Sequence, residues 1–165
     1  MTGASRVSAA TVQIRHRPLT RSPILSWALR IGTAAALAID AAVHAYNAPG
    51  YDDAQVTLSQ GNLFRIEAGV ACAVALLVLV WPRRSTWIAA LLVAASALGA
   101  VLLYRYVDVG SLGPLPNMYE NTWQVPGKVL AAWAEGAAVV LAGLGLLVHR
   151  KHPVMERLLP IGNKT

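Results

Sequence analysis

The sequence predicts an all-α integral membrane protein, folded as an antiparallel four-helix bundle with both termini in the cytoplasm. Three observations predict this class: the composition, four long apolar runs and the positions of the basic residues. The chain of 165 residues is 56% apolar and 13% charged, whereas soluble domains carry roughly 25% charged residues. Its mean hydropathy is +0.49. A water-soluble enzyme is therefore not expected, and the single cysteine, Cys72, excludes a disulfide framework or a cysteine-based metal cluster.

Four apolar runs are long enough to cross a bilayer as helices, since about 20 residues at a rise of about 1.5 Å each span the hydrocarbon core. Clusters of glycine and proline separate the runs and interrupt helices, because proline lacks an N–H group and glycine adds backbone freedom. The runs are too long, too rich in alanine and leucine and too little alternating for barrel strands. The predicted spans are residues 24–46, 63–81, 87–107 and 128–148.

The basic residues predict the orientation of these spans. Residues 1–23 are expected to form a flexible basic arm and residues 149–165 a basic tail, and Arg83 and Arg84 fill the turn between the second and third spans. The loops 47–62 and 108–127 contain no lysine or arginine. The positive-inside rule therefore places both termini and the turn in the cytoplasm and both loops outside a cell membrane.

The basic arm raises the alternative of a nucleic-acid partner, because residues 1–23 hold four arginines and no acidic residue. The arm lacks interleaved aromatic residues, so we expect contact with anionic lipid and no nucleic acid.

Small residues and aromatic residues predict how the spans pack and where they end. Small residues spaced four apart allow helix backbones to approach closely, and aromatic residues favour the membrane interface. The small pairs are Ala68 and Cys72, Gly69 and Ala73, Ala95 and Gly99, Ser96 and Ala100, and Ala132 and Gly136, with Gly143 and Gly145 further along. The predicted interfacial aromatics are Tyr46, Trp81, Trp87, Tyr104, Tyr106 and Trp123.

Ionisable residues gather in the outer halves of the predicted spans. Arg30, Thr33, Leu37, Asp40 and His44 follow one stripe of the first helix, and the last two form an i,i+4 pair. Counting residues places Asp40 and the Glu135 of the fourth span roughly 10 Å below the outer boundary. Glu67 and His44 lie shallower, and Arg65, Arg105 and Lys128 lie near the rim. These positions predict a polar funnel that opens outward.

Two interpretations of the funnel stay open. Internal ion pairs would join Asp40 to His44, Glu67 to Arg105, and Glu135 to Lys128 or an arginine, although buried pairs contribute little net stability. Alternatively, the residues form a binding site, because an intramembrane charge costs about 2.5–3.5 kcal/mol and marks function by default. The candidate ligand-binding residues are Asp40, His44, Glu67, Arg105, Lys128 and Glu135, and the candidate metal ligands are Asp40, His44, Glu67 and Glu135. A quinone head group, a small polar ligand and a proton-coupled site are further versions of this interpretation.

The loop 109–127 combines Gly and Pro residues with apolar side chains. Apolar side chains on an irregular outer loop are expected on lipid, on the funnel or on a partner protein. Interfacial anchoring is the simplest role, and a lid made by Met118, Tyr119 and Trp123 is the alternative. His149 and His152 flank basic residues after the fourth span, where a solvated or lipid-facing position is expected.

A family resemblance rests on short motifs in the first three spans. Leu29-Arg30-Ile31-Gly32 followed by His44 resembles the start of DoxX-like membrane proteins, and Glu67-x-Gly69 and Pro82-Arg83-Arg84 before Ala89-Ala90-Leu91-Leu92 are also similar. The similarity covers about residues 29–107, but the lysine usually found near the end of that first helix is absent. The chain also resembles uncharacterised four-helix membrane proteins of actinobacteria, which have an acidic residue in the second span and a glutamate in the fourth. The DoxX-like resemblance implies membrane redox chemistry and a quinone, and it assigns no catalytic residue.

The sequence contains no nucleophile elbow, phosphate-binding loop, HExxH, CxxC or haem-attachment motif, so an enzyme is not the favoured class. The leading prediction is an accessory or ligand-binding subunit of the plasma membrane that uses the polar funnel. The alternative is a DoxX-like redox-associated component that binds quinone or a metal, and the third is a small transporter that works as an oligomer. The expected partners are the lipid bilayer and either another membrane protein or a second copy of the chain. The sequence names no cofactor.

Overall fold

The computed structural model describes residues 22–53 and 58–149. Over these residues the protein is all-α, without strands, and has four helices that are long and apolar enough to cross a membrane. They are α1 (Pro23–Asn47), α2 (Gln60–Val80), α3 (Arg84–Tyr106) and α4 (Lys128–Val148), and a short 3-10 helix, η1 (Ala48–Tyr51), follows α1. The prediction of an all-α protein with four helices that are able to cross a membrane is confirmed at this level. Residues 1–21 of the predicted arm and 150–165 of the predicted tail, His152 included, lie outside the described residues.

Local sequence determines where the helices begin. The Ser59 side chain accepts a hydrogen bond of 3.1 Å from the Asn62 backbone N–H and caps α2. Helix α2 consequently begins at Gln60, before the apolar run from which the span 63–81 was predicted. Helix α4 follows Gly127, whose φ of 76° favours a residue without a side chain. A Cβ atom there would also crowd the Val43 side chain of α1.

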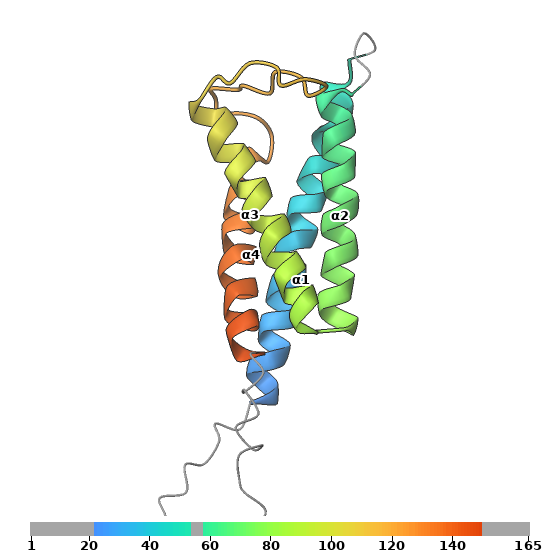
Figure 1. The fold of residues 1–165 in the computed structure, drawn as a ribbon, viewed down its shortest axis with the longest axis vertical. Coiled ribbons are helices and arrows are strands. Elements are labelled where there is room, and N and C mark those ends of the chain that lie inside the picture. Colours follow the sequence, from blue (N-terminus) through green and yellow to red (C-terminus); the bar gives the residue numbers. More distant parts are fainter. Residues whose placement is uncertain (1–21, 54–57, 150–165) are drawn as a thin grey trace, which may run out of the picture.

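The four helices lie side by side, and the described ends of the chain lie together (Figure 1). Helix α1 contacts both α2 and α4, and α3 contacts α4 and, less extensively, α2. The start of α1, the connection between α2 and α3 and the end of α4 lie at the lower end of the molecule. The connection between α3 and α4 crosses the upper end, next to η1.

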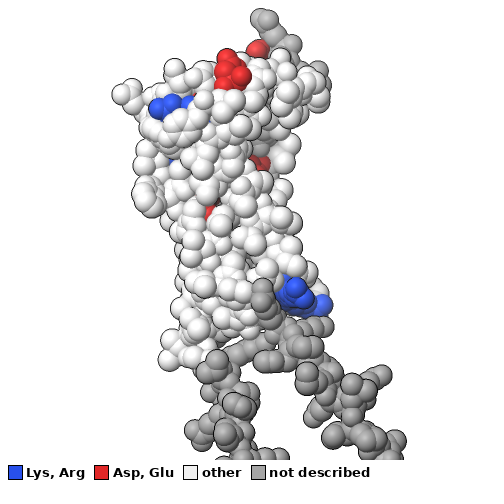
Figure 2. Space-filling model, turned by 60° about the vertical axis from the view of Figure 1, so that its left-hand side comes forward, with Lys and Arg blue, Asp and Glu red and all other residues white. Residues whose placement is uncertain are grey.

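Charged side chains differ between the two ends of the molecule. On the face drawn in Figure 2, lysine and arginine are the only described charged side chains at the lower end, whereas both signs occur at the upper end. Acidic atoms are also visible part-way along the molecule. The charged residues are therefore distributed unevenly along the length of the helices, as the sequence predicts.

Alanine makes up most of the buried apolar residues in the described part of the chain. Ala90 and Ala94 of α3 and Ala138 and Ala142 of α4 are fully buried in one cluster with Leu37 of α1. Small side chains let the backbones approach closely, and dispersion then holds the helices together in an apolar solvent.

The prediction that the pairs of small residues mark helix contacts is wrong for several of the glycines. A Cβ atom added to Gly69, Gly99, Gly136 or Gly143 would meet nothing within 4 Å, and Cys72 is exposed. In a chain this rich in alanine, the spacing of small residues does not distinguish the packed face from the lipid face. Gly145 is the exception, because its missing side chain leaves room for the Trp87 ring.

The predicted interfacial aromatic Trp87 is a second correction. Its side chain is fully buried and lies against Gly145, with its ring centroid 5.4 Å from that of His149. The His149 Nδ1 atom lies 2.8 Å from the Gly145 carbonyl oxygen, so His149 packs against the protein and is only half-buried. By contrast, Tyr46, Trp81 and Tyr106 are exposed, which suits aromatic residues at a membrane interface.

Candidate functional site

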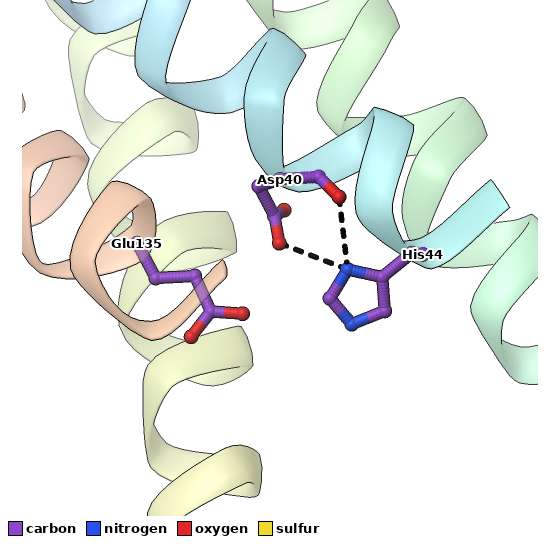
Figure 3. Close-up of side chains that lie close together, drawn as sticks. All are labelled: Asp40, His44 and Glu135. Atoms are coloured by element: carbon purple, nitrogen blue, oxygen red, sulfur yellow. Dashed lines mark hydrogen bonds and ion pairs between the residues drawn. The ribbon is translucent and has the colours of Figure 1, made fainter. Parts of the chain in front are cut away.

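The stripe predicted on α1 faces the interior. Thr33, Leu37 and Asp40 are all buried, and His44 lies one turn beyond Asp40. The His44 Nδ1 atom is 3.1 Å from the Asp40 backbone oxygen and 2.9 Å from the Asp40 Oδ1 atom (Figure 3). The backbone oxygen is an acceptor only, so Nδ1 carries the proton and donates it there. The Asp40 carboxylate is thus an ion-pair neighbour of His44 without a hydrogen bond of its own.

Helix α4 brings Glu135 to this pair. Glu135 is fully buried, and Figure 3 shows its carboxylate pointing toward Asp40 and His44. One ligand atom from each of the three residues lies within 4.8 Å of the other two. Neither carboxylate oxygen of Glu135, nor either of Asp40, has a hydrogen-bond partner within the described part of the chain. Asp40 and Glu135, which were predicted to lie at similar depth, therefore converge with His44, which was predicted to lie shallower.

A cavity of about 420 Å³ opens beside this cluster. All four helices, η1 and the connection between α3 and α4 contribute to its wall, and most of the lining side chains are apolar. His44 and Glu67 are the deepest ionisable groups of the lining, because they lie one to two turns below η1 and the start of α2. The apolar lining includes Val43, Leu63, Phe64, Ala97, Val101, Tyr104, Leu115 and Met118.

A second cluster of polar side chains lies at the upper end of the cavity. The Tyr51 hydroxyl donates to both carboxylate oxygens of Glu120 at 3.0 Å, and the Lys128 Nζ atom donates to the Glu120 backbone oxygen at 3.0 Å. These contacts hold the connection between α3 and α4 against η1 and α4. Sequence reasoning missed Tyr51 and Glu120. Glu120 is the only charged residue within 109–127, which is the one signal that could have marked it.

Two of the predicted ion pairs are absent from the described structure. Lys128 pairs with Glu120 at 3.5 Å and not with Glu135. The Arg105 guanidinium lies over the rings of Tyr106 and Trp123, at 5.0 and 5.7 Å. The Glu67 Oε1 and Arg105 Nε atoms have no hydrogen-bond partner among the described residues. The predicted contact of Asp40 with His44 is present, so pairing accounts for only part of the buried charge.

The predicted lid residues lie in different places. Met118 lines the cavity. Trp123 instead contacts Tyr106, with ring centroids 6.5 Å apart, and Tyr119 is 38% exposed and is absent from the cavity lining. Leu115, which the prediction did not single out for this role, lines the cavity with Met118.

An exposed ion pair joins the loop after η1 to α2. The two terminal guanidinium nitrogens of Arg65, Nη1 and Nη2, each donate to one Asp52 carboxylate oxygen at 2.7 Å. These charge-assisted bonds hold the pKa of Asp52 below its ordinary value. Arg65 is absent from the cavity lining, whereas Glu67 belongs to it.

Comparison of the chain with protein-family models, with curated proteins and with solved structures found no match. The DoxX-like resemblance therefore stays a prediction. The buried cluster and the cavity beside it are the features from which a function can be argued.

Proposed function

We propose that this protein is a multi-pass protein of the cell membrane that binds a small, mainly apolar molecule in an outward-facing cavity. In this proposal the helices form an antiparallel four-helix bundle with both termini in the cytoplasm. The observation that carries the proposal is the cavity of about 420 Å³, because ligand pockets of about 300–1,000 Å³ suit drug-sized molecules.

The lining supports an amphiphilic occupant. A mainly apolar wall with a few placed polar groups is the usual composition of a small-molecule site, since the apolar wall supplies affinity and the polar groups fix orientation. His44 and Glu67 would contact a polar head group. Phe64, Tyr104 and Met118 would contact its apolar part.

The distribution of basic residues supports the outward orientation of the cavity. Arg83 and Arg84 follow α2, at the end of the molecule where α1 begins and α4 ends (Figure 1). The cavity lies near η1 and residues 107–127, where the sequence has no arginine or lysine. The positive-inside rule favours the basic end in the cytoplasm.

The test is identification of the bound molecule. The full chain is purified in a mild detergent, extracted with organic solvent and analysed by mass spectrometry beside an Ala100→Phe variant. Ala100 lines the cavity, so the added ring occupies the space without changing charge. We expect the wild type to carry a molecule that the variant has lost.

An Ala95→Phe variant is the matched control, because Ala95 lies on the same helix but is exposed and outside the cavity lining. It is expected to retain the molecule. Equal amounts of every extracted molecule in all three proteins would contradict the proposal.

A quinone is the second candidate occupant, and with it an accessory role in membrane redox chemistry. The observation that favours it is the presence of polar groups at two depths, His44 with Glu67 and Tyr51 with Lys128, separated by roughly 10 Å along α1 and η1. Two carbonyl groups on a flat apolar ring would suit such a site. The same extract answers this question, because a quinone changes its ultraviolet absorbance on reduction with borohydride and the other lipids do not.

A further inference from the structure

We propose that Asp40, His44 and Glu135 form a binding site for one divalent metal ion in the interior of the helix bundle. The site lies behind the cavity wall to which His44 belongs. It does not depend on a molecule in the cavity, so it goes beyond the proposed function.

The first argument is the cost of the buried carboxylates. Asp40 is 1% exposed and Glu135 is 0% exposed, and their four oxygens have no hydrogen-bond donor among the described residues. A buried charge is strongly unfavourable unless it is paired or coordinates a metal. His44 lies 2.9 Å from the Asp40 carboxylate, whereas no ion pair joins Glu135 among the described residues. Because both side chains point toward a common centre (Figure 3), a single cation there would satisfy both.

The second argument is the orientation of the imidazole. His44 donates its Nδ1 proton to the Asp40 backbone oxygen at 3.1 Å, which leaves the lone pair of the neutral ring on Nε2. Metal-binding histidines almost always donate their other ring nitrogen to a carbonyl or carboxylate group, and this contact fixes the tautomer and the ring direction. The contact therefore fixes the tautomer of His44 and leaves Nε2 as its free ligand atom, although the nitrogen next to the Asp40 carboxylate is Nδ1 (Figure 3).

The third argument is geometry. One oxygen of Asp40, one oxygen of Glu135 and a ring nitrogen of His44 lie within 4.8 Å of one another. Ligands bound to one ion at about 2.0–2.2 Å are separated by at most about 4.4 Å. Binding of one ion therefore requires the three side chains to move closer by a few tenths of an ångström.

Charge balance indicates the class of ion. Two carboxylates and a neutral imidazole carry a net charge of minus two, so a divalent cation makes the buried cluster neutral. Mixed oxygen and nitrogen ligands suit hard to borderline ions such as Mn²⁺ and Zn²⁺, whereas soft ions prefer sulfur. The helical Glu-x-x-His pattern of di-metal carboxylate bundles is absent from α1–α4, which favours a single ion.

The cavity provides a route for the ion. His44 and Glu67 both line it, and the Glu67 Oε1 atom has no hydrogen-bond partner among the described residues. An ion that enters from the upper end meets the Glu67 carboxylate before it reaches Asp40 and Glu135. Water from the cavity would supply the remaining ligands.

The test uses the full chain purified in mild detergent, with an affinity tag that lacks histidine. The protein is stripped with EDTA, incubated with Mn²⁺, Zn²⁺ or Co²⁺ alone, and desalted. We expect about one ion per chain for at least one of these metals, together with a higher melting temperature, since a ligand that binds only the folded state stabilises it. Bound Co²⁺ would also show d–d absorption.

A Glu135→Gln variant tests the assignment. The substitution keeps the shape and removes a carboxylate without a partner, so the metal-free variant is expected to fold and to melt no lower than the wild type. Its metal affinity is expected to fall by more than about 100-fold, because even loss of an outer partner of a ligand costs about 10–100-fold. His44→Gln and Asp40→Asn are expected to weaken binding similarly.

An Asp108→Asn variant is the matched control. Asp108 is exposed and bonds only to the nearby Gly110 and Asn117 in the described structure, so it should bind metal as the wild type does. The proposal is overturned if the wild type binds none of the metals, which would indicate that the two carboxylates share protons instead. It is equally overturned if Glu135→Gln binds as tightly as the wild type. Neither result bears on the molecule extracted from the cavity.

Discussion

Thr33 and Thr86 are both buried, but only the hydroxyl group of Thr86 makes a hydrogen bond within the described structure. The Thr33 Oγ1 atom has no hydrogen-bond partner among the described residues, whereas the Thr86 Oγ1 atom donates to the Trp81 carbonyl oxygen at 2.9 Å. Valine has the same shape as threonine without the hydroxyl group. Replacing an unpaired polar group by an apolar group of equal shape is neutral or stabilising, but loss of a made hydrogen bond costs about 1 kcal/mol.

We therefore expect Thr33→Val to leave the melting temperature in detergent unchanged or raised, and Thr86→Val to lower it. Thermal melts followed by circular dichroism measure both. A lower melting temperature for Thr33→Val than for Thr86→Val would mean that Thr33 makes a hydrogen bond in the folded protein.

Asp52 lies outside the helices that could span a membrane, and its pair with Arg65 gives a pH dependence. Arg65 lowers the pKa of Asp52 in the folded protein, so the pair contributes stability at pH values above the ordinary pKa of the carboxyl group. This contribution is lost as the pH falls through the lowered pKa. We expect Arg65→Gln to raise the pKa of Asp52 toward its ordinary value in a carbon-13 NMR titration of the side chain.

The control for this titration is Arg84→Gln, which removes a basic residue at the opposite end of the molecule and should leave the titration unchanged. An identical pKa in the wild type and Arg65→Gln would show that the two side chains do not pair in solution.

Residue spacing predicted only the local part of the site. The contact of Asp40 with His44 follows from their i,i+4 spacing on one helix, and counting residues placed Asp40 and Glu135 at similar depth. The bonds of Glu120 to Tyr51 and Lys128 were not predictable this way, because they depend on how residues 107–127 cross the upper end of the molecule.

At the scale of helices, two glycines of α4 allow the effect of packing on stability to be measured separately from the effect of helix propensity. A Cβ atom on Gly145 would overlap the Trp87 ring, whereas one on Gly143 would meet nothing within 4 Å. We expect Gly145→Ala to destabilise the protein by about 1–3 kcal/mol, the usual cost of overpacking. Gly143→Ala should be neutral or stabilising, since alanine is the better helix former by about 1 kcal/mol.

Melting temperatures in the same detergent compare the two variants. If Gly145→Ala melts at or above the temperature of Gly143→Ala, then Trp87 is not packed against Gly145.

The helices themselves were predictable, and their contact faces were not. Four runs of about 20 apolar residues predict four spans because the bilayer leaves few alternatives for such a chain. The same apolar solvent removes the contrast between buried and exposed residues, so fully buried Ala90 and exposed Ala95 look alike in the sequence. Position alone likewise misassigned Trp87, because a tryptophan near a span boundary packs inward when the facing helix offers a glycine.

The orientation of the whole molecule is the property on which the outward cavity depends. Arg83 lies between α2 and α3 and Arg84 begins α3, whereas residues 107–127 between α3 and α4 contain no basic residue. Moving an arginine across the bilayer during insertion is costly, so the basic end is expected to stay in the cytoplasm. Ser85 lies at the basic end and Ser111 in the opposite connection, and both are exposed.

Labelling of introduced cysteines measures this orientation directly. In a Cys72→Ser background, which removes the native thiol, a membrane-impermeant maleimide is expected to label Ser111→Cys in intact cells and Ser85→Cys only after the membrane is permeabilised. The Cys72→Ser protein without a second substitution is the control and should remain unlabelled. The reverse pattern would turn the cavity toward the cytoplasm. The metal proposal would survive that result, because the distances among Asp40, His44 and Glu135 are independent of orientation, but the ion and the bound molecule would then have to come from inside the cell.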